Sequence, residues 1–294
     1  MDSISQGITI KILGGLGNQL FQYAVGRSMA LQLGCPLYLD LRGIGSKRNR
    51  VYLLDQFTHA GLDAVGMNLP PLRQKSLRWR LFKNHYLQKH NMVFALSNDI
   101  DERLFNPKIG QYFSGNWQSE TYFKSVAENI RKDFTLKQEP AGMDAEYLRK
   151  IDGCESVAVH VRRGDYLKGK KNLNRFAVCS ANYYHDAAMM IIKTKRIMPV
   201  FFVFSDDIEW ASTNLNLPGQ VYFVDHNNYK SAHQDLRLMA SCKHNIIANS
   251  TFSWWGAWLN TNTQKMVISP RQWYLGKTLS NDHINAGSFT LIDN

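Results

Sequence analysis

The second half of the chain alternates short apolar runs with segments of helical spacing, and this alternation strongly constrains the fold. The apolar runs, rich in β-branched and aromatic residues, predict strands at 156–161, 200–205, 221–224, 245–248 and 266–268. The segments between them predict helices at 181–194, 207–214, 233–242 and 252–259. Strands that are joined through helices lie parallel in their sheet. The fold class that follows is α/β, with a doubly wound parallel sheet.

The first half begins with the same kind of unit. A β-like run at 8–13 leads into a glycine-rich turn at 14–19, a helical pattern at 20–33 and a second apolar run at 37–39. In this interpretation Asn18 caps the helix and Gly34 ends it.

A breaker cluster at 139–142 separates the two halves. We therefore expect two Rossmann-like α/β domains, residues 1–140 and 141–294, that face each other across a cleft. This arrangement would place a ligand between the carboxyl ends of two parallel sheets.

Composition places the chain among globular proteins. Of its 294 residues, 44% are hydrophobic and 12% are aromatic, which is too much for a disordered chain. The most apolar runs are far shorter than the ~20 residues of a membrane span, and the first residues lack the pattern of a secretory signal. The cysteines form no C-x-x-C pair, so we expect reduced thiols in a cytoplasmic protein rather than a zinc site. They are Cys35, Cys154, Cys179 and Cys242.

The net charge of +11, from 35 Lys and Arg against 24 Asp and Glu, favours an anionic partner. Nucleic acid, a phosphorylated small molecule and an anionic membrane surface all fit, as does a basic surface without such a partner. The basic segment 73–89 interleaves its charges with aromatic and aliphatic residues. It could lie on the inner membrane as an amphipathic helix or form a solvated hairpin, and we favour the hairpin.

Two motifs follow predicted strands, where open α/β sheets bind their ligands. The turn 14–19 allows a close approach of backbone to a ligand, although a tight turn without a ligand fits as well. It is neither a dinucleotide fingerprint, because Leu20 replaces the third glycine, nor a P-loop. The motif 160–166 contains Arg162 and Arg163, and a guanidinium can bind a diphosphate with two parallel hydrogen bonds. The structural alternative is that one arginine pairs with a neighbouring carboxylate or a helix end.

Further polar groups carry more than one interpretation. Ser205 or Asp206 could cap the predicted helix 207–214. The adjacent carboxylates Asp206 and Asp207, at the end of a predicted strand, could instead bind a metal or hydrogen-bond a sugar. Residues 249–253 precede a helix and could cradle an anion or simply cap that helix. Asp99 and Asp101 could hold a metal, but their neighbours indicate a helix start. Elsewhere the spacing of His, Cys and acidic residues indicates no metal site, so we expect none.

Several of these segments, in this order, resemble glycosyltransferase family 11, the α-1,2-fucosyltransferases. They are 14–24, 115–120, 160–166, 204–207 and 250–255. The resemblance implies a GT-B fold and an inverting transfer of L-fucose from GDP-fucose to the 2-hydroxyl of a terminal galactose, without a metal or other cofactor. The animal members carry an N-terminal membrane anchor. Without one, this sequence is similar to bacterial enzymes that act on O-antigen or capsule units in the cytoplasm.

The resemblance also implies roles for individual residues. Arg162 would neutralise the leaving phosphate, and His160 and Asp235 would lie at the guanosine. Gly17 and Asn18 would face the diphosphate and the fucose, with Asn18 and Arg162 as the catalytic residues. The other residues expected to bind GDP-fucose are Arg163, Asp165, Asp207, Ser250, Thr251, Phe252 and Ser253.

The general base and the exact reaction stay open at this point. Asp40 and Glu120 are candidate bases in the first half. A transferase for another sugar nucleotide, a sugar-binding protein without turnover and a nucleic-acid-binding protein are the alternative functions.

Overall fold

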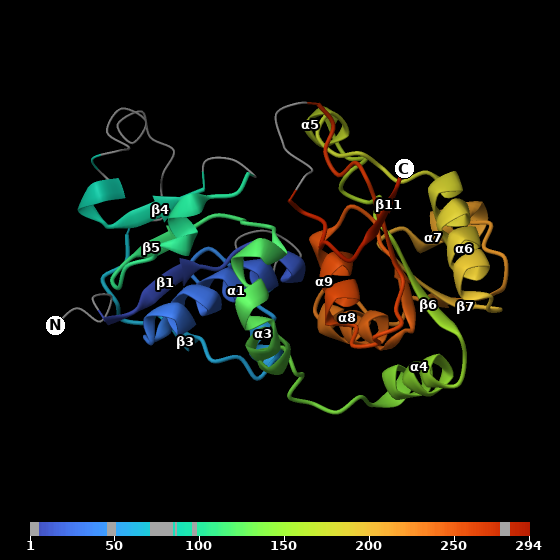
Figure 1. Ribbon diagram of the computed structural model, residues 1–294, viewed down its shortest axis with the longest axis horizontal. Coiled ribbons are helices and arrows are strands. Elements are labelled where there is room, and N and C mark those ends of the chain that lie inside the picture. The colour runs from blue at the N-terminus through green and yellow to red at the C-terminus, as the bar shows by residue number, and fades with distance from the viewer. Residues whose placement is uncertain (1–5, 46–50, 71–84, 86, 96–98, 277–282) are drawn as a thin grey trace. The chain divides into compact units, whose positions relative to one another are not determined.

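The computed structural model describes residues 6–45, 51–70, 85, 87–95, 99–276 and 283–294. The chain divides into two compact units, Met1–Lys137 and Gln138–Asn294 (Figure 1). Most of the basic segment 73–89 lies outside the described residues. Among the described residues, no helix is long and apolar enough to span a membrane.

The first unit is built on a parallel five-stranded sheet in the order β3-β2-β1-β5-β4. The strands are β1 (Ile8–Lys11), β2 (Leu37–Asp40), β3 (Leu62–Asp63), β4 (Met92–Phe94) and β5 (Tyr112–Ser114). Its α-helices are α1 (Leu16–Leu33) and α3 (Ala127–Asp133), and its short 3-10 turns are Leu54–Gln56, Glu102–Phe105, Glu120–Tyr122 and Lys124–Val126. The expected strand, turn, helix and strand at the start of the chain are confirmed.

The start of α1 differs from the prediction. The helix begins at Leu16, four residues earlier than expected, and its N-cap is Gly15 rather than Asn18. Gly14 has a positive φ of 88°, so the chain reverses there at little steric cost and the helix can start at once. Gly34 does end the helix in the left-handed conformation, as expected.

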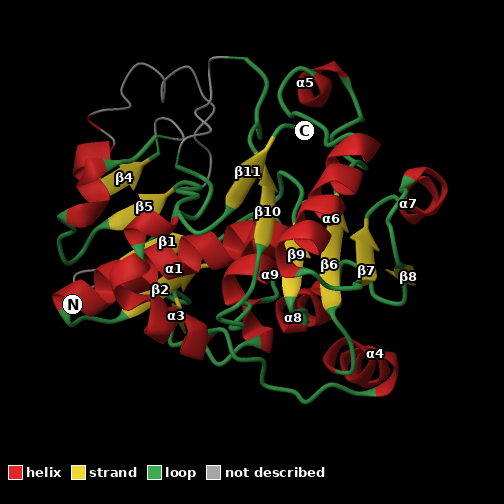
Figure 2. Cartoon of the chain, turned by 45° about the vertical axis from the view of Figure 1, so that its right-hand side comes forward, coloured by secondary structure: helices red, strands yellow, loops and turns green. Residues whose placement is uncertain are grey.

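The second unit is built on a parallel six-stranded sheet in the order β11-β10-β9-β6-β7-β8 (Figure 2). The strands are β6 (Ser156–Val161), β7 (Val200–Ser205), β8 (Gln220–Val224), β9 (His244–Ile246), β10 (Val267–Pro270) and β11 (Thr290–Ile292). The helices are α4 (Gly142–Asp152), α5 (Lys170–Leu173), α6 (Ala181–Lys195), α7 (Ile208–Asn214), α8 (Ala232–Ser241) and α9 (Thr251–Leu259). The parallel sheet with interleaved helices is therefore confirmed.

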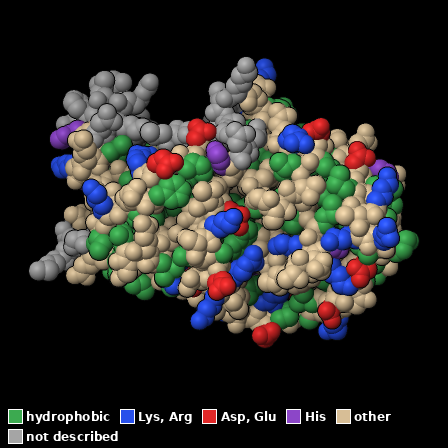
Figure 3. Space-filling model, viewed as in Figure 1, with side chains coloured by type: hydrophobic (Ala, Val, Ile, Leu, Met, Phe, Trp, Pro, Cys, Tyr) green, Lys and Arg blue, Asp and Glu red, His purple; other side chains and the backbone are tan. Residues whose placement is uncertain are grey.

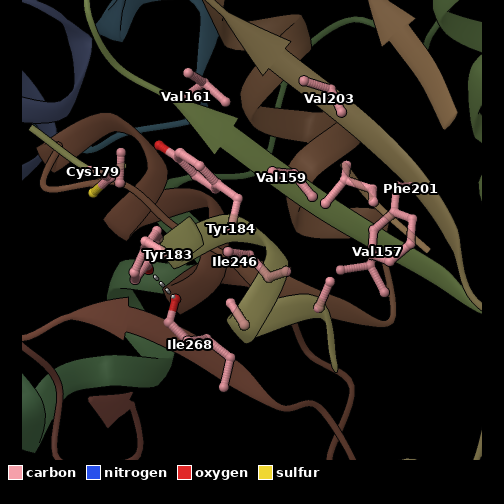
Figure 4. Packing of buried hydrophobic residues seen from close by; sticks show 14 of the residues in the cluster. Val157, Val159, Val161, Cys179, Tyr183, Tyr184, Phe201, Val203, Ile246 and Ile268 are labelled. Carbon is pink, nitrogen blue, oxygen red and sulfur yellow. Dashed lines mark hydrogen bonds between the residues drawn. The ribbon is translucent and has the colours of Figure 1, made fainter. Parts of the chain in front are cut away.

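Alternate residues of each strand point to opposite sides of this second sheet. Both of its faces are buried. On one face, alternate residues of 157–161 pack against Tyr183 and Tyr184 of α6 (Figure 4). On the other face, Ala158 packs in a cluster with Leu238 and Met239 of α8. Helices on both sides explain why the strands are apolar throughout rather than alternating.

Three elements of the second unit were not predicted. Helix α5 has four residues and is too short to show a period. Helix α4 buries only Tyr147 and Ile151, one turn apart, which is too few apolar positions to reveal a helical period. Strand β11 has three residues and lies at the edge of the sheet. All four cysteines are free thiols, and two of them are buried.

Candidate active site

The site in the second unit forms where β6 and β7 end side by side. Arg162 follows β6, and its Nη2 lies 2.6 Å from Asp165 Oδ1 while its Nη1 lies 3.0 Å from Asp206 Oδ2. Burial disfavours the charge of Arg162, but the two carboxylates outweigh burial and hold its pKa above the ordinary value. The guanidinium is thus a fixed cation at the carboxyl edge of the sheet, where parallel α/β sheets bind ligands.

Asp206 also holds the backbone of the loop that carries Arg162. Its Oδ1 accepts hydrogen bonds from the amides of Arg163, at 2.9 Å, and Gly164, at 3.2 Å. A Cβ on Gly164 would lie 2.5 Å from Asp206 Oδ2, so no larger residue fits there without a shift. The close approach of Asp206 therefore explains why glycine stands at position 164 in the Arg-Gly-Asp motif.

Arg163 and Asp207 form a separate pair beside α7. The Arg163 guanidinium lies 3.7 Å from the ring centre of Trp210, and its Nε is 3.6 Å from Asp207 Oδ2. Asp207 is the N-cap of α7, and its Oδ1 accepts from the amide of Trp210 at 3.2 Å. The expected cap at Ser205 or Asp206 is therefore wrong, because Asp206 accepts from the amides of the loop after β6 and Ser205 Oγ accepts from the amide of Asp207. Arg163 is held by stacking on Trp210 of α7 rather than between carboxylates.

The start of α9 lies near this loop. Ser250 is the N-cap and accepts from the amide of Phe252. The Ser253 hydroxyl is fully buried and donates to backbone carbonyls, so it supports the turn from inside. The Tyr166 hydroxyl donates to the carbonyl of Asn249 at 2.8 Å, and this bond ties the loop after β6 to the loop before α9. Both the capping and the cradle interpretations remain compatible with this arrangement.

His160 is a neutral imidazole at the end of β6. It is only 5% exposed, its ring lies 5.7 Å from the ring of Phe252, and its Nδ1 has no hydrogen-bond partner among the described residues. Burial, together with the nearby charge of Arg162, lowers its pKa to about 3. Histidine at this position can therefore donate or accept a hydrogen bond at neutral pH but carries no charge.

Asp235 lies in a polar cluster that sequence reasoning missed. Asn227 Nδ2 donates to Asp235 Oδ1 at 2.9 Å and to Asp144 Oδ1 at 2.8 Å, and His226 Nε2 lies 2.9 Å from the same Asp144 oxygen. Burial raises the pKa of Asp235 to about 7, although Asn227 and His226 act against it. Asp144 comes from α4, so no local spacing in the sequence connects it with Asp235.

In the first unit, buried amides hold the turn after β1. Gln22 Oε1 accepts from the amide of Leu13 at 2.9 Å, and its Nε2 donates to Gly115 O and to Asn116 Oδ1, both at 3.2 Å. Asn18 Oδ1 accepts from Gln118 Nε2 at 2.8 Å. The segments 14–24 and 115–120 therefore meet, because β1 and β5 are parallel neighbours.

Gln19 is a second buried amide in this turn, and Gly17 beside it is buried as well. Gln19 Nε2 donates to the carbonyls of Gly14 and Val51. Two glutamines on the buried face of an otherwise apolar helix are the sequence signal that could have revealed this network.

The two candidate general bases, Asp40 and Glu120, lie in different environments. Asp40 is 1% exposed, and its two oxygens accept from Arg42 and from the Tyr112 hydroxyl. Burial would raise the pKa of Asp40, but these hydrogen bonds lower it below the usual range, so Asp40 is unsuited to be a general base. Glu120 begins a 3-10 turn and is half-buried.

The Asp99 and Asp101 triplet has a structural explanation. Asp101 caps the turn Glu102–Phe105 and pairs with Arg103, with Nη2 2.6 Å from Oδ2. No group of three or more His, Cys, Asp and Glu residues in the described part of the chain could hold a metal ion.

On the one face that Figure 3 shows, the basic side chains of the described residues do not form one continuous band. On the face shown in Figure 3, Lys and Arg side chains lie on both units with Asp and Glu side chains among them. Nucleic-acid-binding surfaces gather their basic side chains on one face or along one helix. The visible face of the described residues therefore gives no support to the nucleic-acid alternative.

Three relatives are similar to most of this chain. Alpha-1,2-colitosyltransferase of Escherichia coli is 33% identical over 282 residues, which cover 91% of this chain and 92% of that protein. The O-antigen biosynthesis glycosyltransferase WbnK of Escherichia coli is 30% identical, with 91% and 95% covered. Galactoside alpha-(1,2)-fucosyltransferase 2 of Mus musculus is 28% identical, with 86% and 69% covered.

A solved structure confirms the fold class. NodZ alpha-1,6-fucosyltransferase, soaked with GDP-fucose, superimposes with a TM-score of 0.51 over 86% of this chain and 92% of that protein, at 18% identity. This likeness agrees with the expected GT-B class of two parallel α/β domains. The pattern of Glycosyl transferase family 11 matches residues 1–285. The chain therefore belongs to glycosyltransferase family 11.

Proposed function

We propose that this glycosyltransferase moves L-fucose from GDP-fucose to the 2-hydroxyl of a terminal galactose, with inversion at the anomeric carbon. The observation that carries the proposal is Arg162, a fixed cation directly after the central strand β6 of a family 11 enzyme. O-antigen-type glycans are the acceptors we propose, in line with the similarity to an O-antigen glycosyltransferase.

The proposed donor site uses the second unit. Arg162 meets the β-phosphate, and Ser250, Thr251 and Phe252 at the start of α9 offer the positive end of a helix to the diphosphate. His160 and Asp235 bind the guanosine, with Asp235 accepting from the base or ribose edge. The nearby Arg163, Asp165, Asp207 and Ser253 complete this region, and Gly17 and Asn18 of the first unit are assigned to the transferred sugar.

The mechanism follows from where charge develops. As the bond from the anomeric carbon to the diphosphate oxygen breaks, the sugar gains oxocarbenium character and GDP gains negative charge. A guanidinium already fixed at that charge stabilises the transition state more than the ground state. The galactose 2-hydroxyl attacks from the opposite face, so a β-linked donor gives an α-linked product. Because GDP is a good leaving group, a strong base is not required.

A second donor, GDP-colitose, is favoured by one observation, the 33% identity to an alpha-1,2-colitosyltransferase. Colitose is L-fucose without its 3-hydroxyl. A site that hydrogen-bonds this hydroxyl would reject colitose by about 10⁴-fold, whereas an apolar pocket would reject fucose by only about 10²-fold. The ratio of kcat/KM for the two donors therefore shows which sugar the site is built for.

The test is transfer from an equimolar panel of GDP-fucose, GDP-colitose, GDP-mannose and UDP-galactose to lactose and to a galactose-terminated oligosaccharide. We expect an α-1,2-linked fucose or colitose product by mass and proton NMR, and undiminished transfer in excess EDTA because Arg162 supplies the cation at the phosphate. Transfer only from UDP-galactose, a β-linked product, or an EDTA loss that Mn²⁺ restores would each contradict a stated part of the proposal.

A further inference from the structure

The charge around Arg162 is not balanced for a diphosphate. One guanidinium lies between two carboxylates, Asp165 at 2.6 Å and Asp206 at 3.0 Å, so one positive and two negative charges leave the group at −1. A diphosphate that approached this group would be repelled, because like charges at contact distance cost several kcal/mol in a partly buried site. One of the two carboxylates must therefore give way when a diphosphate binds.

Asp206 is the carboxylate that is anchored. Its side chain is 27% exposed, and besides Arg162 it binds the amides of Arg163 and Gly164 through Oδ1. Moving it would leave two backbone donors without their acceptor, which is costly wherever water cannot replace it. The missing side chain of Gly164 gives Asp206 the space it occupies, since a Cβ would lie 2.5 Å from Oδ2.

Asp165 is the carboxylate that can leave. Its side chain is 45% exposed, and it lies three residues after Arg162 in the same loop. An ion pair this open to solvent contributes little, because water screens it and solvates the released carboxylate. The Asp165 backbone is held separately, by Asn172 Nδ2 donating to its carbonyl at 2.8 Å, so the side chain can turn away without unfolding the loop.

We propose that Asp206 is a positioning residue that holds Arg162 in place for the phosphate, and that Asp165 is a counter-ion that the diphosphate displaces. This inference rests on the proposed GDP-sugar donor. It assigns opposite roles to two aspartates that contact the same guanidinium, and it removes Asp165 from direct contact with the donor.

Two isosteric variants separate the roles. Asp165→Asn removes the competing charge, so GDP should bind about two- to fivefold tighter, the size of effect that a solvent-exposed ion pair allows. Asp206→Asn keeps an oxygen for the two amides but removes the charge that fixes Arg162. Its turnover at saturating donor should fall about 10- to 100-fold, with a smaller change in KM, because positioning matters most in the transition state.

The experiment measures the Kd of GDP by calorimetry and kcat and KM with the sugar donor, for wild type and both variants. Glu155→Gln is the matched control, because its pair with Lys243 lies at the opposite end of the sheet, before β6 and β9. Melting temperatures report folding. If Asp206→Asn does not fold, Gly164→Ala replaces it, since the added Cβ pushes on Asp206 without removing a polar group, and the same loss of turnover is expected.

The results distinguish this inference from the function it rests on. If wild type binds GDP and Arg162→Ala abolishes that binding, but Asp165→Asn weakens GDP binding as Asp206→Asn does, the displaced counter-ion is wrong and the donor site stands. If Asp206→Asn or Gly164→Ala keeps wild-type turnover, the positioning role is wrong. If wild type binds no GDP, both the inference and the proposed donor fail.

Discussion

The turn after β1 in the first unit and the turn after β6 in the second unit take equivalent places, each at the carboxyl end of a strand inside a parallel sheet. They are held by different chemistry. Gln19 and Gln22 hold the first turn with neutral amides that are fully buried. The second turn is held by Asp206 and Arg162, which keep about a quarter of their side-chain surface exposed.

The difference indicates what each turn is for. A neutral amide satisfies backbone donors and acceptors without a net charge, so it can be buried completely at a modest cost. A guanidinium and two carboxylates are expensive to bury, and a fold retains such groups where a charged ligand repays the cost. Under the proposed function, the second turn meets the anionic diphosphate, whereas the buried amides of the first turn keep the backbone shape that presents Gly17 and Asn18.

Removing the cation should have the largest effect. We expect Arg162→Ala to lower turnover at saturating GDP-fucose by about 10²–10³-fold, the effect of losing a preorganised donor at a developing charge. Arg162→Lys should restore little, because an ammonium cannot replace the two-pronged guanidinium. Arg163→Lys should be milder, since Arg163 lies against Trp210 and not between the two carboxylates.

The matched control is Arg271→Ala, which removes a 60% exposed arginine of the same unit that pairs with Asp293. Its turnover should equal that of wild type. An Arg162→Ala protein with a normal melting temperature and more than about a tenth of wild-type turnover would show that Arg162 does not bear the phosphate. In that case the start of α9 or the turn of the first unit would have to do so.

Removing a neutral amide should instead lower stability. Gln22→Ala leaves the Leu13 amide and the Gly115 carbonyl without their partner inside the unit. We expect the unfolding free energy to fall by about 2–3 kcal/mol and the melting temperature of the first unit to fall by about 6–9 °C. Because no charge is involved, the loss should be the same at low and high salt.

Gln32→Ala, on the same helix, is the control. Gln32 is exposed and donates a hydrogen bond to the Phe105 carbonyl at 3.1 Å, so its removal should cost well under 1 kcal/mol, as is usual for the surface. A Gln22→Ala protein as stable as Gln32→Ala, or one whose loss changes with salt, would mean that the amide network does not hold the turn.

The sequence predicts the second unit better than the first for a physical reason. Long apolar strands buried on both faces leave a clear pattern, and β6 and β7 have the predicted bounds. Strands of two or three residues and single 3-10 turns, which make up much of the first unit, are too short to show a period.

The same contrast applies to the site. Arg162 and Asp206 are recognisable because they directly follow strands. The predicted cap of α7 is wrong, because Asp206 binds loop amides that come from a segment 42 or 43 residues away in the sequence, and Asp207 caps the helix instead. Asp144 could not be connected with His226, because 82 residues separate them and only packing of α4 brings them together.

The smallest expected effect concerns the pH dependence of GDP binding. It depends on the carboxyl group of Asp235 in the second unit. Burial raises the pKa of Asp235 to about 7, and the groups that face it are Asn227, His226 and Asp144. If Asp235 accepts a hydrogen bond from guanosine, only its ionised form binds well. The ionised fraction falls from about nine-tenths at pH 8 to about a tenth at pH 6, so GDP should bind about tenfold more weakly at pH 6.

The sign follows from the direction of the shift. A raised pKa means that the protein holds a proton at neutral pH that the ligand must expel, so GDP binding at pH 7 should release about half a proton, measurable by calorimetry in two buffers of different ionisation enthalpy. The phosphate of GDP itself titrates near pH 6 and adds its own dependence. Asp235→Asn isolates the carboxyl, because it keeps the side-chain size and leaves the phosphate unchanged. If the variant shows the same pH dependence and proton release as wild type, Asp235 does not bind the guanosine through its carboxylate.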